Sequence, residues 1–204
     1  PQNAPQAQTN WRHILKHDTN FRLHLICRVL IYLTGLATPF YVSHAINILQ
    51  APENIIGLFV IAQTFSGLLF SLGLSVVVEK WGPRHIIWIG CGIAAAAPLY
   101  ALTAHLVGAP WLIQAYPLVY IALGALNNIW MMGFFNYLLE IAPAEQRTAY
   151  IGLTNTVIGL ASFVLLMGGW LLTATSYPFL FGLATILALA GLLLSFRLGD
   201  SHPK

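Results

Sequence analysis

The sequence predicts an all-α membrane protein, a bundle of six transmembrane helices. Three observations lead to this prediction. The chain is 58% hydrophobic and only 7% charged, with a mean hydropathy of +0.75, outside the usual range of soluble domains. It contains six apolar runs, each long enough to cross a bilayer core of about 30 Å, which takes about 20 helical residues. The breaks between the runs are short, so no soluble domain fits between two helices.

The six helices are expected in order at residues 21–49, 55–78, 85–107, 111–141, 148–173 and 177–196. The first contains Pro39, which should bend it and free a backbone carbonyl. The breaks that separate the helices are QAPEN, EKWGPR, GAP, APAEQR and SYP, all rich in Pro, Gly or charge. Helices are expected rather than strands because barrel strands would be about 10 residues long and alternate in polarity.

The two ends of the chain differ in composition from the bundle. Residues 1–20 open with PQNAPQAQTN and are expected to be a cytoplasmic polar linker or tail. Residues 21–198 form the predicted transmembrane bundle, and residues 199–204 a second cytoplasmic tail. Cys27 and Cys91 lie in separate apolar runs and are interpreted as small buried hydrophobic residues. We therefore expect no disulfide, no metal site and no cofactor.

Basic residues indicate how the bundle is oriented. Four of the nine Lys and Arg lie at or just inside the start of the first helix, two after the second, one after the fourth and two after the sixth. The breaks after the first, third and fifth helices contain none. Positive residues favour the cytoplasmic side, so we expect both termini there. The protein is expected to be integral to a bacterial inner (plasma) membrane.

The first charged break resembles a motif of a known family. In the major facilitator superfamily of transporters, the turn between the second and third helices of each half carries Gly-x-x-x-Asp-Arg-x-Gly-Arg-Lys. Aligned on Gly82, this chain has Glu79 at the Asp, Lys80 at the following basic position and Arg84 at the last one. Pro83 stands where the family usually has a basic residue.

A second break strengthens the resemblance. The stretch EIAPAEQRTAYIGL is similar to the family segment in which a Glu closes the fourth helix, a Pro follows and an Arg opens the fifth. The matching residues are Glu140, Pro143 and Arg147. With the polar segment before the first helix, the chain resembles the C-terminal six-helix half of a major facilitator superfamily transporter.

The resemblance implies a fold and a function. The bundle would consist of two inverted three-helix repeats and would carry out secondary transport of a small solute by alternating access. Its partners would be membrane lipid, the solute and a second six-helix half, either a missing N-terminal half or a second copy of this chain. No nucleic-acid partner is expected. We predict no enzyme activity, since Gly-x-Ser-x-Gly and His-Glu-x-x-His are absent. The alternative is a non-transporting membrane scaffold or sensor.

Polar residues within the predicted helices are the candidates for a solute path, because such groups are costly in lipid and usually face the bundle interior. The resemblance implies that the first and fourth helices of a half line its cavity. Hydrogen bonds between helices are the alternative role for these residues. Aromatic and amide groups suit an uncharged or amphipathic solute. The candidates are Tyr116, Tyr120, Asn127, Asn128, Gln63, Asn155, Thr34, Tyr41 and His44.

The charged breaks supply the candidates for a cytoplasmic gate. One interpretation is a hydrated turn; the other is a network of charges that holds one conformation closed, which needs only a few kcal/mol. The gate candidates are Glu79, Lys80, Gly82, Arg84, Glu140 and Arg147.

Arg28 lies six residues beyond Arg22, roughly 9 Å deeper along a helix. We expect its long side chain to reach back to the cytoplasmic surface, with contact to an anionic substrate as the alternative.

Overall fold

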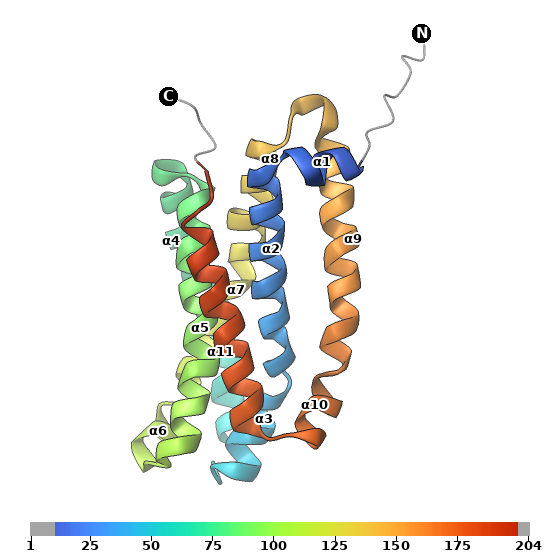
Figure 1. Ribbon diagram of the computed structural model, residues 1–204. Helices are drawn as coiled ribbons and strands as arrows, with labels where there is room; N and C mark the ends of the chain where they lie inside the picture. Colours follow the sequence, from blue (N-terminus) through green and yellow to red (C-terminus); the bar gives the residue numbers. More distant parts are fainter. Residues whose placement is uncertain (1–10, 200–204) are drawn as a thin grey trace.

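The computed structural model describes residues 11–199, and within them the chain is helical with short connections (Figure 1). The elements are α1 (Trp11–His17), α2 (Thr19–Leu33), η1 (Thr34–Ala37), α3 (Phe40–Ser43), η2 (His44–Ile48), α4 (Ile55–Trp81), α5 (Pro83–Val107), α6 (Pro110–Gln114), α7 (Pro117–Ile129), η3 (Trp130–Phe135), α8 (Asn136–Ile141), η4 (Ala144–Gln146), α9 (Arg147–Leu166), α10 (Gly168–Ala174) and α11 (Tyr177–Ser195).

These elements combine into six stretches in the described residues that are long and apolar enough to cross a membrane. We call them spans 1 to 6. They run over Thr19–Ile48, Ile55–Trp81, Pro83–Val107, Pro110–Ile141, Ala144–Ala174 and Tyr177–Ser195. The predicted six-helix bundle is confirmed, and each predicted helix overlaps one span.

Glycine and proline set where several spans begin and end. Gly82 has φ 78° and Gly108 has φ 63°, values that favour glycine, and these residues end α4 and α5. Pro83 and Pro110 stand in the first turns of α5 and α6, where a missing backbone N–H has no cost. At these two turns the sequence therefore places a helix stop within two residues of the next helix start.

Span 1 is not a uniform α-helix. After Leu33 it narrows to the 3₁₀ segment η1, and α3 begins directly after Pro39. Proline has no N–H to donate to the preceding turn, and the backbone N–H of Thr38 bonds instead to the Gly35 carbonyl at 3.1 Å. The irregular backbone lies where Thr34 and Thr38 reach the interior.

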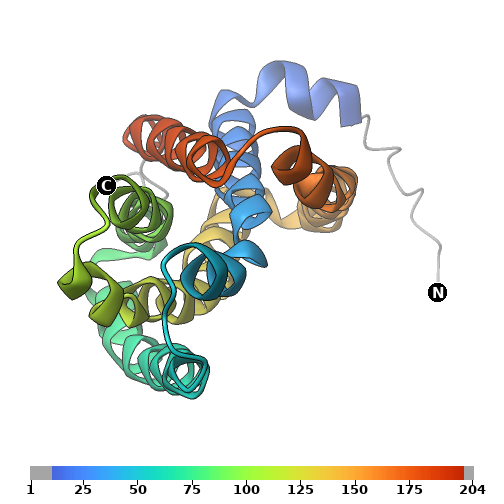
Figure 2. The same ribbon diagram turned by 90° about the horizontal axis from the view of Figure 1, so that it is seen from below.

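The spans pack unevenly. The most extensive packing joins α4 to α7 and α5 to α11, and α11 also packs on α2. By contrast α9 packs mainly on α2, and few of its residues are buried. Seen along the bundle, α4 and α9 stand at separate corners, with α2 and α7 between them (Figure 2). Both α4 and α9 therefore show long apolar surfaces to their surroundings.

Charged turns gather at one end of the molecule. The α4–α5 turn, the α8–α9 turn and the C-terminal end of α11 lie at the same end as α1, whereas α3, α6 and α10 lie at the other (Figure 1). We call these the α1 end and the α3 end. The predicted linker 1–20 is only partly covered, because residues 1–10 lie outside the described residues; the predicted tail is described only at Gly199.

The part of the predicted linker that the structure describes is helical and packs on the bundle. Ile14 of α1 is buried in a cluster with Phe21 and Leu138. Asp18 then caps α2: its Oδ1 accepts the Phe21 backbone N–H at 2.8 Å, and its Oδ2 accepts the Tyr150 hydroxyl of α9 at 2.8 Å. One carboxylate thus begins a helix and ties it to its neighbour.

Candidate functional site

A cavity of about 190 Å³ lies between the first five spans. Span 1 contributes the largest share of its wall together with span 4, and spans 2, 3 and 5 complete it. Apolar side chains, among them Ala94, Leu123 and Leu165, make up much of the lining. Its polar and aromatic members are Tyr32, Thr34, Thr38, Gln63, Asn127 and Trp130.

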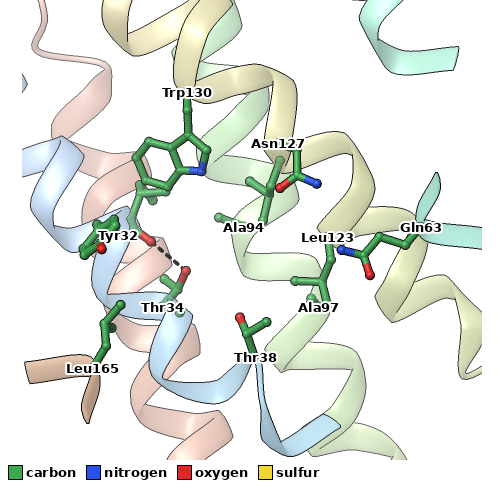
Figure 3. Close-up of a pocket in the computed structure, with 13 residues that line it drawn as sticks. Tyr32, Thr34, Thr38, Gln63, Ala94, Ala97, Leu123, Asn127, Trp130 and Leu165 are labelled. Atoms are coloured by element: carbon green, nitrogen blue, oxygen red, sulfur yellow. Dashed lines mark hydrogen bonds between the residues drawn. The ribbon is translucent and has the colours of Figure 1, made fainter. Parts of the chain in front are cut away.

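The two amides lie on another side of this cavity than the polar residues of span 1. Gln63 of α4 and Asn127 of α7 stand apart from Tyr32 and Thr34 of span 1 in the close-up view (Figure 3). The Thr34 hydroxyl donates to the Ile31 carbonyl at 2.7 Å, so only its lone pairs remain for a ligand. Each amide can both donate and accept, which suits recognition of a polar solute group.

Gln63 and Asn127 also line a second hollow of about 400 Å³ on the open side of α4 and α7, together with Thr64, Ser71 and Asn128. There the Asn128 side-chain amide donates to the Gly67 carbonyl of α4 at 2.8 Å. This bond joins two helices, as the packing role predicts. Gln63 and Asn127 therefore line both hollows, whereas the side chain of Asn128 is fixed by its hydrogen bond to α4.

A separate polar cluster lies at the α3 end. His44 is fully buried, and its Nδ1 lies 3.0 Å from the Tyr116 hydroxyl while its Nε2 lies 3.0 Å from Nδ1 of His105. One group of each pair must donate, so the tautomers of the two imidazoles are coupled. His44 and Tyr116 are thus brought together, but among the described cavities neither lines the one in Figure 3.

The remaining path candidates are dispersed. Tyr120 stacks on Phe59 of α4 with ring centroids 4.2 Å apart, and Tyr41 stacks on Phe181 of α11 at 5.2 Å. Asn155 is exposed on α9. Of the nine sequence candidates, Thr34, Gln63 and Asn127 line the cavity of Figure 3 and Asn128 the neighbouring hollow.

Sequence reasoning missed three members of these sites. Tyr32 and Trp130 meet edge-on at the wall of the cavity, with ring centroids 5.9 Å apart and an interplanar angle of 76°. The spacing of Trp130, three residues after Asn127, is a helical signal that could have found it. His105 bonds to His44, but nothing in the sequence pairs two histidines that lie 61 residues apart.

The gate candidates lie in the two charged turns at the α1 end. Glu79 and Lys80 are exposed in the last turn of α4, and Gly82 makes the turn itself. The guanidinium of Arg84 lies over the Trp88 ring, 4.7 Å from its centroid. Cation–π contact accounts for part of the position of Arg84.

The other gate candidates, Glu140 at the end of α8 and Arg147 at the start of α9, are exposed. In the described part of the chain, no ion pair within 4.0 Å joins Glu79, Glu140 and Arg147 to one another. The role of the gate candidates stays a prediction.

A match to a known protein family shows what kind of protein this chain is. The family model for the Major Facilitator Superfamily matches residues 25–204, nearly the whole chain. No curated protein matches the chain. Members of this family are transporters rather than enzymes, lie in lipid and handle small solutes, and six spanning helices fit one half of such a protein. The chain therefore belongs to the major facilitator superfamily of membrane transporters.

Proposed function

We propose that this chain is the C-terminal six-helix half of a secondary transporter that moves a small solute by alternating access. The observation that carries the proposal is the cavity between spans 1 and 4, with the amides of Gln63 and Asn127 on its wall. Discontinuous helix segments that line a cavity are typical of solute sites in secondary transporters, and η1 and η3 supply such backbone here.

A second six-helix half completes this proposal. The faces of α4 and α9 expose large apolar side chains, among them Phe65, Leu72 and Phe163, and such faces need lipid or protein against them. An N-terminal half preceding the polar segment, or a second copy of the chain, would close the cavity from the side of α4 and α9. Residues 1–20 then connect or precede the halves on the cytoplasmic side, as residues 199–204 follow them, in a bacterial inner membrane.

The charged turns belong to the same proposal. Glu79, Glu140 and Arg147 are exposed in turns at one end of the molecule, and Arg84 is part-buried in the α4–α5 turn at the same end. In the conformation that is closed to the cytoplasm, these residues pair with one another or with the second half, and the pairs separate when that side opens. Networks of partly buried charges are more stabilising than isolated exposed pairs, which contribute roughly 0–1 kcal/mol.

A non-transporting scaffold or sensor is the second candidate. The observation that favours it is the Asn128–Gly67 hydrogen bond, in which a polar group of span 4 holds two helices together. If all interior polar groups acted in this way, Gln63 and Asn127 would be packing residues and no solute would pass.

Replacing the two cavity amides separates these functions. We expect Gln63→Leu and Asn127→Leu each to reduce transport at least about 10-fold, because a site built to hydrogen-bond a solute group is left without its partner. Uptake of a panel of labelled carboxylates, amines, nucleosides and sugars into proteoliposomes measures this, with thermal unfolding of the same variants as the test of folding.

Asn47→Leu is the matched control, since Asn47 is an exposed amide at the α3 end. It should leave uptake unchanged. Full uptake by both cavity variants would exclude the cavity as the solute path. Absence of uptake of every panel member by the well-folded natural protein would favour the scaffold.

A further inference from the structure

Buried polar atoms without a partner concentrate on one turn of α2. In the described part of the chain, six buried side-chain nitrogen or oxygen atoms have no hydrogen-bond partner. Four of these six belong to His24 and Arg28: both ring nitrogens of the histidine, and Nε and Nη1 of the guanidinium. Native proteins satisfy most buried polar atoms, so such a concentration calls for a ligand.

The two side chains share one face of α2. They are four residues apart, which places them one above the other on a helix. His24 is fully buried, and its ring packs on Tyr137 and Phe134 of span 4 with centroids 5.4 and 5.8 Å apart. One turn beyond Arg28 on the same face, Tyr32 meets Trp130 at the wall of the cavity. Arg28 therefore lies between two aromatic contacts that join spans 1 and 4.

No carboxylate of the described residues balances the charge of Arg28. The nearest acidic residue along α2 is Asp18, and its two oxygens already accept the Phe21 N–H and the Tyr150 hydroxyl. The other described acidic residues are exposed in turns or at helix ends. Arg28 as a whole is part-buried, and Nε and Nη1 of its guanidinium are buried without a hydrogen-bond partner. The reach of its side chain to the cytoplasmic surface stays a prediction. A cation in this position is costly unless an anion pairs with it.

The chemistry of the pair fits one class of ligand. Arginine presents planar, parallel N–H donors that match the two oxygens of a carboxylate or phosphate. A neutral imidazole supplies one further N–H donor. Beyond Tyr32 the cavity wall is aromatic and apolar, apart from the two amides and the threonine hydroxyls. An amphipathic solute would therefore find its charged and apolar partners in succession along span 1.

We propose that His24 and Arg28 bind the carboxylate or phosphate of an amphipathic organic anion, whose apolar part lies against Tyr32 and Trp130. This inference rests on the proposed transport function and names its substrate class. The oxygens of the anion accept from the guanidinium of Arg28 and from the imidazole N–H of His24. Binding neutralises the buried cation, so the anion is preferred over an uncharged solute of the same shape.

Equilibrium binding tests this site without any transport. Benzoate and phenyl phosphate are the probes, benzyl alcohol is the uncharged analogue, and the readout is the shift of Tm of the intact protein in neutral detergent at increasing probe concentration. We expect a saturable rise of Tm with either anion and none with the alcohol. Equal stabilisation by benzyl alcohol would overturn the proposal.

Three variants locate the effect. Arg28→Gln should weaken anion binding about 10- to 100-fold and leave Tm without probe unchanged or raised, because an unpaired buried charge is removed. Arg28→Lys keeps the charge without the planar donors and should bind with intermediate affinity. His24→Phe keeps the ring packing and should weaken binding less than Arg28→Gln. Arg22→Gln is the matched control, since Arg22 is exposed nearer the start of α2, and it should bind like the natural protein.

The same measurement in nanodiscs separates two sources of the anion. In discs of phosphatidylcholine alone, the probes should bind as in detergent. If phosphatidylglycerol stabilises the natural protein but not Arg28→Gln, and also displaces the probes, a lipid headgroup occupies the site and the solute assignment is wrong. Intact probe binding without uptake would remove the transport function instead, and undiminished binding by Arg28→Gln would remove the anion site alone.

Discussion

Gly124 marks the closest approach of two spans, where α7 crosses α4. A Cβ at this position would collide with the Gln63 carbonyl and the Ser66 hydroxyl of α4. Neither atom can move far, because the carbonyl belongs to a helix backbone and the hydroxyl is bonded to that same carbonyl at 3.0 Å. Small residues let helix backbones approach closely in a membrane, where packing replaces the hydrophobic effect as the attraction between helices. Gln63 therefore keeps its position at the cavity because Gly124, which faces it from α7, has no side chain.

Substitution of this glycine should separate the two helices. We expect Gly124→Ala to destabilise the protein by about 1–3 kcal/mol, as overpacking of a close contact does. Gly73→Ala in α4 is the matched control: nothing lies within 4 Å of its Cβ, so helix propensity should leave Tm equal or slightly higher. Thermal unfolding in detergent measures both. A Tm for Gly124→Ala at or above that of the control would contradict this packing.

Single residues of the site were predictable only in part. Gln63 and Asn127 stand out in the sequence because an amide inside an apolar run must find a partner. Tyr116 and Tyr120 share a helical face with Asn127 in the sequence, yet their rings pack on Phe59. Periodicity shows which residues share a face, but it does not show whether that face meets a neighbouring helix or a cavity.

At the level of elements, the two charged turns at the α1 end belong to different spans. One turn follows α4 and the other precedes α9, the two spans with the fewest buried residues. Because α9 packs chiefly on α2, whereas α4 packs extensively on α7, the start of α9 can change its distance from the α4–α5 turn at little cost in packing. The turns are thus placed where a conformational change would alter the distance between their charges.

Removing one acidic charge from each turn should favour the conformation that is open on this side. We expect the double variant Glu79→Gln/Glu140→Gln to raise the rate at which an impermeant maleimide labels a cavity cysteine, Thr38→Cys, from the α1 side. A lost network of about 1 kcal/mol corresponds to roughly a 5-fold change in population. Labelling of inside-out vesicles gives the rate.

The control for this effect is Lys16→Gln, which removes an exposed charge from α1 and should leave labelling unchanged. Equal labelling rates in the double variant and the natural background would remove the gate proposal and leave the turns as hydrated loops.

The helices themselves were predictable because apolar length and Pro–Gly breaks determine where a chain crosses a membrane. The sequence did not predict two irregular segments, the 3₁₀ segment Thr34–Ala37 and the π-helical segment Trp130–Phe135. Pro39 indicated an irregularity, but the change of helix type precedes it and depends on contacts with other spans. No proline and no pair of glycines marks the wider turn of η3, so the sequence alone predicts a continuous α-helix there.

For the whole molecule, the described Lys and Arg other than Arg28 lie in elements of the α1 end. Positive residues are retained on the cytoplasmic side during insertion. The α4–α5 turn and the α8–α9 turn lie about 60 residues apart in the sequence. The fold places both at the same end, because an even number of spans lies between them. The distribution of charge and the path of the chain thus agree on one orientation.

Cysteine labelling in intact cells checks this orientation. With an impermeant maleimide, Asn54→Cys after span 1 should react from outside, whereas Glu145→Cys between spans 4 and 5 should react only after the membrane is opened. Both positions are exposed, and the natural Cys27 and Cys91 are fully buried, so they give little background. Reaction of Glu145→Cys in sealed cells would reverse the assignment.

The sparse packing of α9 has a thermodynamic consequence. Its contacts inside the chain are made chiefly with α2, and the Tyr150–Asp18 hydrogen bond fastens only its first turns. Anything that covers its apolar face binds the ordered helix better than the detached one, and so stabilises it by mass action. The stability of α9 in its packed position therefore rises with the concentration of the lipid or protein that covers it. The stability of this helix therefore depends on what covers its apolar face as well as on its contacts within the chain.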